Sequence, residues 1–219
     1  RVWEREEIEK AMEVYEKNKC LVISDEIWSD LTLEGHKHIP TQSVNEYAHE
    51  HTFAFYAPSK TFNLAGLVGS YHIVYNSYLR DRLMEAEKCS HYNSANVLSI
   101  SALMGAYTKE GAEWVDELRE VLTQNVDYAY TYITTHFEGV SVAKAQGTYM
   151  LYLDCSGWLK AHPEMTMDDL IRAGIAVGVV WQDGRPFMNP NTIRMNLAVP
   201  HALVKEAMDR LDKYVFNAK

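Results

Sequence analysis

The sequence is poor in cysteine, and its three cysteines do not follow the spacing of a metal site. Cys20, Cys89 and Cys155 lie far apart along the chain, so the paired spacing of zinc-binding motifs is absent. An odd number of cysteines also argues against a secreted domain held together by disulfides. We therefore expect a cytoplasmic protein without a metal site.

Long hydrophobic runs and an excess of basic residues are also missing. No stretch approaches the roughly 18 apolar residues that span a bilayer, and no signal-peptide pattern is visible. The 21 basic residues are outnumbered by 30 acidic ones, which gives a formal net charge of −9. Such a chain offers no basic surface to neutralise a phosphate backbone. The sequence therefore predicts that the chain binds neither a membrane nor nucleic acid.

What the chain does contain is an alternation of helical and strand patterns, typical of an α/β protein. Its length allows one or two domains, and its 47% hydrophobic and 23% charged residues are ordinary for a globular protein. Helices are predicted at residues 3–17, 77–87, 95–107, 110–136, 166–173 and 201–214, and strands at 20–24, 52–56, 69–75, 140–143, 149–153 and 193–197. The apolar character of the first three strands suits a sheet covered on both faces.

A lysine follows one of these strands and an aspartate follows another. The apolar run 52–56 is followed by the small residues Ala57 and Pro58, by Ser59, and then by Lys60, while Asp25 ends the run that begins at Cys20. Strand ends are where α/β proteins build their sites. This pair suits pyridoxal 5′-phosphate (PLP), because a lysine binds its aldehyde and a carboxylate keeps its ring nitrogen protonated. Taken alone, Lys60 is equally a surface lysine and Asp25 a turn cap.

Five segments in this order resemble the class I/II aminotransferase superfamily of fold-type I PLP-dependent enzymes. They are Ser24-Asp25-Glu26-Ile27, His38-Ile39-Pro40, Ala57 to Gly66, Gln146-Gly147-Thr148-Tyr149 and Arg194-Met195-Asn196-Leu197. Within the superfamily, the chain is similar to the MalY/PatB-type cystathionine β-lyases, or C–S lyases. The resemblance covers essentially all 219 residues, but it matches only the C-terminal portion of that family. We therefore expect a partial chain without the family's glycine-containing phosphate loop.

The resemblance implies the domain organisation and the assembly. Residues 1–109 would belong to the large PLP-binding domain, with its N-terminal strands missing. Residues 110–219 would form a linking helix and a small α+β C-terminal domain. Residues 92–96 match a family loop that reaches toward the neighbouring subunit, so the complete protein is expected to be a homodimer. An Asn/Ser helix cap explains these residues equally well.

The resemblance also implies which residues bind the cofactor. Lys60 would hold the PLP aldehyde and later take the substrate Cα proton, and Asp25 would bind the ring nitrogen. Ser59 would touch the cofactor phosphate, although a turn serine is the simpler reading. Trp28 stands where relatives place a tyrosine or histidine near the ring oxygen, with core packing as the alternative. Val68 stands where many relatives carry an arginine for the phosphate.

Substrate-binding residues are implied in the same way. Arg194 would receive the substrate α-carboxylate, since its planar guanidinium suits bidentate recognition; a structural salt bridge is the alternative. Tyr149 and Asn196 would line the same region or pack in the core. His38 is a further candidate for contact with substrate. His36 and His38 show no third ligand in the sequence, so they are not expected to bind a metal.

The activity implied by the resemblance is PLP-dependent α,β-elimination. A small cystathionine- or cysteine-type amino acid would be converted to pyruvate, ammonia and a thiol. The first steps are shared with transamination, so an aminotransferase is the alternative. Because the phosphate loop is outside the matched region, a catalytically incomplete fragment or a non-catalytic binding remnant is a third reading.

Overall fold

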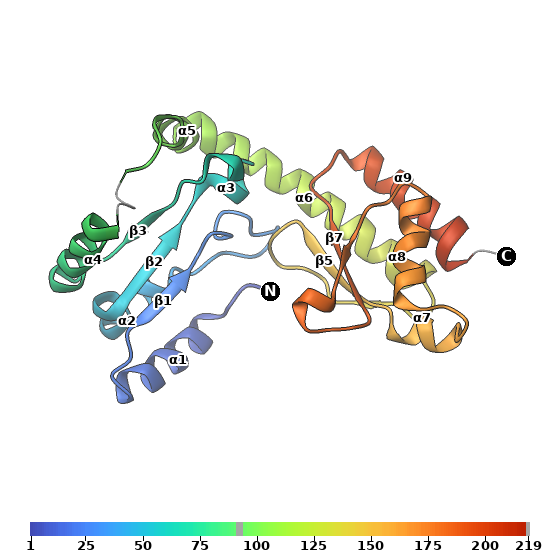
Figure 1. Cartoon of the computed structure of the whole chain (residues 1–219), viewed down its shortest axis with the longest axis horizontal. Coiled ribbons are helices and arrows are strands. Elements are labelled where there is room, and N and C mark those ends of the chain that lie inside the picture. Colours follow the sequence, from blue (N-terminus) through green and yellow to red (C-terminus); the bar gives the residue numbers. More distant parts are fainter. Residues whose placement is uncertain (91–93, 218–219) are drawn as a thin grey trace. The chain divides into compact units, whose positions relative to one another are not determined.

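The computed structural model describes residues 1–90 and 94–217, and the chain divides into two compact units (Figure 1). The first unit is Arg1–Glu117 and the second is Leu118–Lys219, so helix α6 (Lys109–His136) contributes residues to both. In the described ranges, no helix combines the length and hydrophobicity of a membrane span. The assignment of functional domains to 1–109 and 110–219 stays a prediction.

The first unit contains a three-stranded sheet in the order β1-β2-β3. β1 (Val22–Asp25) runs parallel to β2 (Thr52–Tyr56), and β3 (Tyr71–Ile73) runs antiparallel to β2. β2 has the predicted bounds, whereas β1 is shifted toward the C-terminus and β3 is shorter than predicted. The parallel register pairs Asp25 with Phe55, so β1 and β2 end side by side.

Helices α1 (Arg5–Lys17) and α2 (Glu46–His51) pack together on one face of this sheet. Ile8 and Met12, one turn apart on α1, form a buried cluster with Ala48 of α2. This spacing is the helical periodicity predicted from the sequence. The other helices of the unit are α3 (Pro58–Thr61), α4 (Ser77–Ser90) and α5 (Val97–Ala106), with 3₁₀ turns η1 at Thr41–Ser43 and η2 at Ala65–Leu67.

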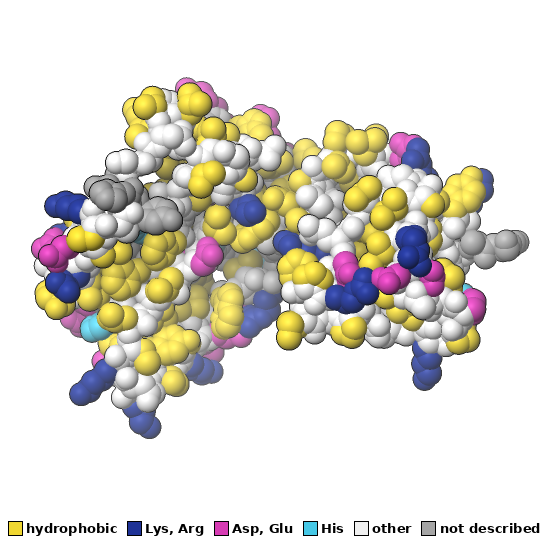
Figure 2. All heavy atoms as spheres, in the orientation of Figure 1, with side chains coloured by type: hydrophobic (Ala, Val, Ile, Leu, Met, Phe, Trp, Pro, Cys, Tyr) yellow, Lys and Arg dark blue, Asp and Glu magenta, His cyan; other side chains and the backbone are white. Residues whose placement is uncertain are grey.

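The opposite face of the sheet is open along β1. Ile23 is 76% exposed and Asp25 is exposed, and Figure 2 shows hydrophobic side chains over much of the visible surface of this unit. Nearer β3, the same face is flanked by α4, where Glu87 Oε1 lies 3.6 Å from His72 Nε2. The expectation of a sheet covered on both faces is therefore wrong for β1 in the described chain, because the side chains on this face of the strand are exposed.

The second unit contains a four-stranded antiparallel sheet in the order β4-β5-β7-β6. Its strands are β4 (Ser141–Val142), β5 (Met150–Asp154), β6 (Gln182–Asp183) and β7 (Thr192–Asn196). Its helices, besides most of α6, are α7 (Ser156–Ala161), α8 (Met167–Ala176) and α9 (His201–Leu211), and α9 continues into a π-helical turn at Asp212–Phe216. β6 and α7 were not predicted. The predicted helix 201–214 corresponds to α9 with this turn.

One face of this sheet forms the core of the second unit. Leu151, Leu153 and Ile193 are at most 1% exposed, whereas Tyr152 is 40% exposed. Side chains alternate between the two faces of a strand, and Tyr152 pairs directly with Arg194. Arg194 therefore points away from the core, on the same face as Tyr152.

Asn125 joins helix α6 to the segment that follows β7. Its Nδ2 donates to the carbonyl oxygens of Leu197 and Val199, each at 2.9 Å, and its Oδ1 lies 2.9 Å from Nδ1 of His201. The residue is fully buried, so each of these partners replaces a lost bond to water. This network fixes the chain just beyond the strand that carries Arg194.

Replacing Asn125 with alanine is expected to lower the free energy of unfolding by roughly 2–3 kcal/mol, because buried partners lose their hydrogen bonds. Urea unfolding measures the change. The matched control is Gln124→Ala, which removes the amide of the exposed neighbour and should shift stability by less than about 0.5 kcal/mol. An Asn125→Ala variant as stable as the control would show that the network contributes nothing.

Candidate active site

The ends of β1 and β2 bring three of the predicted cofactor-site residues to one edge of the sheet. Asp25 is the last residue of β1, and Ser59 and Lys60 lie in α3, one residue beyond β2. Because these strands are parallel, their carboxyl ends share an edge. The topology therefore places a carboxylate, a hydroxyl and an amine along the same edge.

Lys60 sits on a short helix that is anchored to the segment after β1. α3 begins with Pro58, whose fixed φ suits a first helical position. Thr61 Oγ1 donates to Asp30 Oδ2 at 2.9 Å, which ties this helix to the chain beyond β1. These constraints fix the backbone from which the lysine side chain extends.

The amine of Lys60 lies against an aromatic ring. Its Nζ is 5.5 Å from the ring centroid of Trp28, within cation–π range. Within the described residues of the first unit, no carboxylate lies at ion-pair distance from this amine. The structure thus brings two predicted site residues together and leaves the lysine without a counter-ion there. The cofactor-binding role of Trp28 stays a prediction.

Asp25 was expected to be an interior carboxylate, and this expectation is wrong for the described chain. The residue is exposed, and its Oδ1 accepts a hydrogen bond from the backbone N–H of Ile27 at 3.2 Å. The reason is that its side chain lies on the same open face of β1 as Ile23, two residues earlier. The carboxylate therefore caps its own turn here, and its role toward a cofactor stays a prediction.

A second carboxylate, which was not predicted from the sequence, is the most heavily bonded group at these strand ends. Glu26 is 5% exposed. Its Oε2 accepts from His38 Nε2 at 2.6 Å and from the Tyr56 hydroxyl at 2.8 Å. Its Oε1 accepts from Ser24 Oγ at 2.9 Å and from the Thr41 N–H at 3.0 Å. In the sequence, Glu26 could be noticed only as an acidic residue directly after a predicted strand. Apart from Ser24, the residues that donate to it are too far away along the chain to be recognised as its partners.

These contacts set the charge state of the group. Burial alone raises the pKa of Glu26, but the bonds from His38, Thr41, Tyr56 and Ser24 outweigh it and lower the pKa to about 2. Burial, together with the bond to Glu26, raises the pKa of Tyr56. At neutral pH the carboxylate is therefore ionised and accepts, while the phenol is protonated and donates.

This carboxylate is expected to make stability depend on acid pH. Its pKa is about 2 in the folded chain against 4.5 as the ordinary value, so its contribution is complete above about pH 5 and falls as the pH drops toward 2. Between pH 7 and pH 3 the protein should lose about 2 kcal/mol more stability than Glu26→Gln does, measured by urea unfolding. Equal losses in the two proteins would contradict the expectation.

His38 reaches Glu26 through Nε2, and its side chain is 28% exposed. A direct contact of His38 with substrate stays a prediction. Among the residues that the structure describes, no group of three or more His, Cys, Asp or Glu side chains is placed to hold a metal ion.

In the second unit, Arg194 lies on a strand between two core residues. Ile193 is 0% and Met195 is 4% exposed, whereas Arg194 itself is half-buried. Its Cζ lies 4.9 Å from the ring centroid of Phe187. Within the described residues of this unit, no carboxylate lies at ion-pair distance from this guanidinium. Its donors can therefore receive an external carboxylate.

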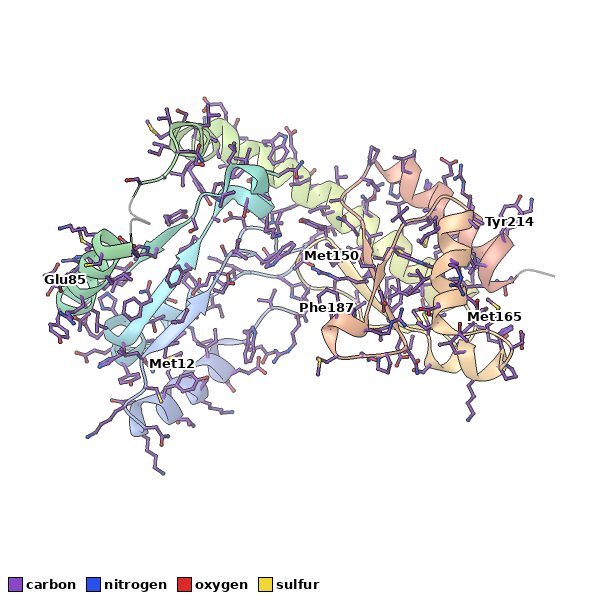
Figure 3. All side chains as sticks on the ribbon, in the orientation of Figure 1. Met12, Glu85, Met150, Met165, Phe187 and Tyr214 are labelled. Carbon is purple, nitrogen blue, oxygen red and sulfur yellow. The ribbon has the colours of Figure 1, made fainter. Side chains whose placement is uncertain are left out.

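Phe187 comes from a 3₁₀ turn, η3. The side chain is labelled in Figure 3, and the turn spans Arg185–Phe187. Arg185 Nη2 lies 2.5 Å from Asp168 Oδ1, and its Nε donates to Asp183 Oδ2 at 2.6 Å. These two ion pairs anchor the turn from which Phe187 reaches the guanidinium of Arg194.

Tyr149 and Arg194 lie close enough to influence each other. Burial raises the pKa of Tyr149, and the positive charge of Arg194 acts in the opposite direction. Asn196 is engaged elsewhere, since its Oδ1 accepts from the N–H of Ala198 at 2.8 Å. The predicted pair Tyr149 and Arg194 is thus brought together, while Asn196 caps its own turn.

The prediction of a subunit contact rests partly on Tyr92 and Asn93, which lie outside the described residues. Asn96 is described, and it is the N-cap of α5. Its Oδ1 accepts from the N–H of Ser99 at 2.8 Å, and its Nδ2 donates to the carbonyl of Leu67 at 2.9 Å. The alternative reading as a helix cap is confirmed for Asn96.

Comparison with known proteins gives a family match for most of the chain. The family model "Aminotransferase class I and II" matches residues 1–211. Cystathionine beta-lyase PatB of Bacillus subtilis is 34% identical over 158 residues, which are 72% of this chain and 41% of PatB. Protein MalY of Escherichia coli is 34% identical over 155 residues, 70% of this chain and 39% of MalY.

The fold of the chain is similar to that of a solved structure. Cystalysin from Treponema denticola, whose crystal structure contains pyridoxal 5′-phosphate, superposes with a TM-score of 0.87 at 27% identity. The match covers 100% of this chain and 55% of cystalysin. Matches to the two bacterial relatives cover about two fifths of their length.

Proposed function

The chain belongs to the aminotransferase class I and II family, and on this basis we propose that the complete protein is a PLP-dependent C–S lyase. It would cleave cystathionine- or cysteine-type amino acids by α,β-elimination into pyruvate, ammonia and a thiol. The observation that carries the proposal is Lys60, which lies four residues beyond the end of β2, at the sheet edge that Asp25 shares, and has no carboxylate partner among the described residues of its own unit. The name of PatB, a cystathionine β-lyase, supports elimination.

The side chains at this sheet edge fit PLP as the cofactor. Lys60 supplies an amine that has no ion-pair partner in the described part of its unit, Asp25 an exposed carboxylate, and Ser59 a half-buried hydroxyl. Val68, which is 87% exposed, adds no positive charge for the phosphate. When bound, PLP accepts the electron pair that is left when the substrate loses its Cα proton.

Lys60 would perform the proton transfer. Its ε-amino group, once free, takes the Cα proton and holds it as an ammonium ion. The Trp28 ring at 5.5 Å stabilises that cation, because an aromatic face attracts positive charge. The carboxylate of Asp25 would hold a proton on the ring nitrogen of the cofactor. These roles are the ones implied by the resemblance to the family, and the chemistry of the two side chains supports them.

Arg194 would bind the α-carboxylate of the amino-acid substrate. Its guanidinium offers parallel N–H donors to two oxygens, and the Phe187 ring at 4.9 Å restricts its orientation. Tyr149 is buried enough for its pKa to be raised, so its hydroxyl stays a donor at neutral pH. We assign Tyr149 to the same substrate contact.

We further propose that the complete protein is a homodimer. Helix α5 supports this, because its ten residues include no charged side chain. Val97, Leu98 and Met104 on this helix are 76%, 68% and 69% exposed. Sedimentation of the complete protein as a monomer would overturn this assignment. The cytoplasmic location predicted from the cysteine count stays a prediction.

Product analysis of the complete protein tests the proposed activity. Supplied with PLP and cystathionine, it should release pyruvate and a thiol without any keto-acid acceptor. Product formation that requires an acceptor would identify an aminotransferase instead. An absence of both reactions, with no attachment of PLP to Lys60, would identify a non-catalytic remnant.

A further inference from the structure

We propose that Glu26 is a positioning residue that fixes the ends of β1 and β2, on which Asp25 and Lys60 are carried. This inference rests on the proposed function, because it concerns the geometry of these two groups. Glu26 directly follows Asp25, and Tyr56, which donates to it, precedes Lys60 by four residues. The carboxylate of Glu26 therefore contacts both the end of β1, which carries Asp25, and the end of β2, which leads to Lys60.

The donors to Glu26 come from three separate segments. Ser24 belongs to β1, Tyr56 ends β2, and His38 and Thr41 belong to the loop between these strands, at 2.6 to 3.0 Å from the carboxylate oxygens. Four donors match the lone pairs of an ionised carboxylate. With 5% of the residue exposed, water cannot replace a donor that withdraws. The three segments therefore move together or lose bonds.

Backbone pairing continues through the same residue. The N–H of Glu26 donates to the carbonyl oxygen of Phe55 at 2.9 Å, which extends the β1–β2 ladder one residue beyond Asp25. The side chain of Asp25 is exposed, but both of its neighbours in sequence are held: Ser24 is hydrogen-bonded to Glu26 and to Thr41 of the loop, and Glu26 to Phe55 of β2. The backbone of Asp25 is therefore fixed by its neighbours and not by its own burial.

The same carboxylate limits the movement of Lys60. The Tyr56 hydroxyl is held at 2.8 Å, and only Ala57, Pro58 and Ser59 separate this tyrosine from the lysine. Losing the acceptor would free the end of β2 at its last residue. We therefore expect both strand ends to loosen when Glu26 cannot accept its four bonds.

Glu26→Gln tests whether the four hydrogen bonds hold the strand ends. Glutamine has nearly the same size as glutamate, but its amide keeps only one oxygen acceptor and presents N–H groups to the remaining donors. In the complete protein without PLP, amide hydrogen exchange should speed up about tenfold over residues 22–30 and 52–61. Glu16→Gln removes an exposed carboxylate from α1 of the same unit and should leave that exchange unchanged. Tyr56→Phe removes one donor of four and should give a smaller change.

With PLP bound, Glu26→Gln should lower kcat/KM by about 100-fold, as expected when reacting groups are misplaced by about 1 Å. It should also shift the pH midpoint of the cofactor's visible absorption, because the carboxylate beside the ring nitrogen has moved. A purely structural role would lower the melting temperature and leave this midpoint unchanged. If Glu26→Gln does not fold, Tyr56→Phe must shift the pH midpoint of the cofactor's absorption in the same direction by a smaller amount.

The outcomes separate this inference from the proposed function. If the unsubstituted protein does not attach PLP at Lys60, the proposed function fails and the inference fails with it. If PLP attaches but Glu26→Gln keeps the wild-type exchange rates and pH midpoint, only the inference is overturned.

Discussion

Replacing Lys60 with alanine in the complete protein will abolish covalent attachment of PLP and lower the rate of pyruvate release by roughly 10³-fold or more. The reason is that alanine has neither the nucleophile for the cofactor aldehyde nor the base for the Cα proton. In the structure the amine lies over the Trp28 ring, with no carboxylate partner among the described residues. Its removal therefore breaks no ion pair there, and the fold should survive.

Borohydride reduction followed by peptide mass spectrometry gives the direct measurement. The wild-type protein should carry the reduced adduct on Lys60, and the alanine variant should carry none. Lys10→Ala is the matched control, since this exposed lysine lies on α1 of the same unit. An adduct that maps to another lysine, or a variant that keeps its rate, would refute the assignment of Lys60.

The second large effect is expected at Arg194. Arg194→Lys keeps the positive charge but loses the planar pair of donors, so the KM for the amino acid should rise about 100-fold, or roughly 3 kcal/mol. Stacking on Phe187 at 4.9 Å also depends on a flat cation, which lysine lacks. The change therefore removes both the bidentate contact and its support.

Comparison of the substrate with its carboxamide makes this test specific. The wild-type protein should prefer the carboxylate strongly, and Arg194→Lys should lose most of that preference. Arg172→Lys is the matched control, because this exposed arginine pairs with Asp169 on α8 of the same unit. An unchanged KM in the Arg194 variant would remove Arg194 from substrate binding.

The elements that could be predicted are those with a local signature. β2 was predicted with its observed bounds because its apolar run ends at a turn of small residues. α6 was predicted to within one residue, since its 28 residues maintain a helical period. β6, with two residues, and α7, with six, are too short for periodicity to be recognised.

The site residues also divide into those that the sequence predicted and those that it did not. Lys60, Asp25 and Arg194 were singled out because each lies in or just after a predicted strand, within a segment that resembles the family. The exposure of Asp25 could not be predicted, because it depends on which elements cover each face of the folded sheet. Glu26 and Phe187 were missed because their contacts join residues whose approach depends on folded loops.

The carboxylate of Glu26 accepts from donors at four positions that are up to 30 residues away along the chain. A change at one of these positions leaves the others with a mismatched partner, so the cost of each substitution depends on which residues already occupy the rest. Across homologous sequences, positions 24, 26, 38 and 56 are therefore expected to covary as a set, and tolerated changes there should arrive in compensating pairs.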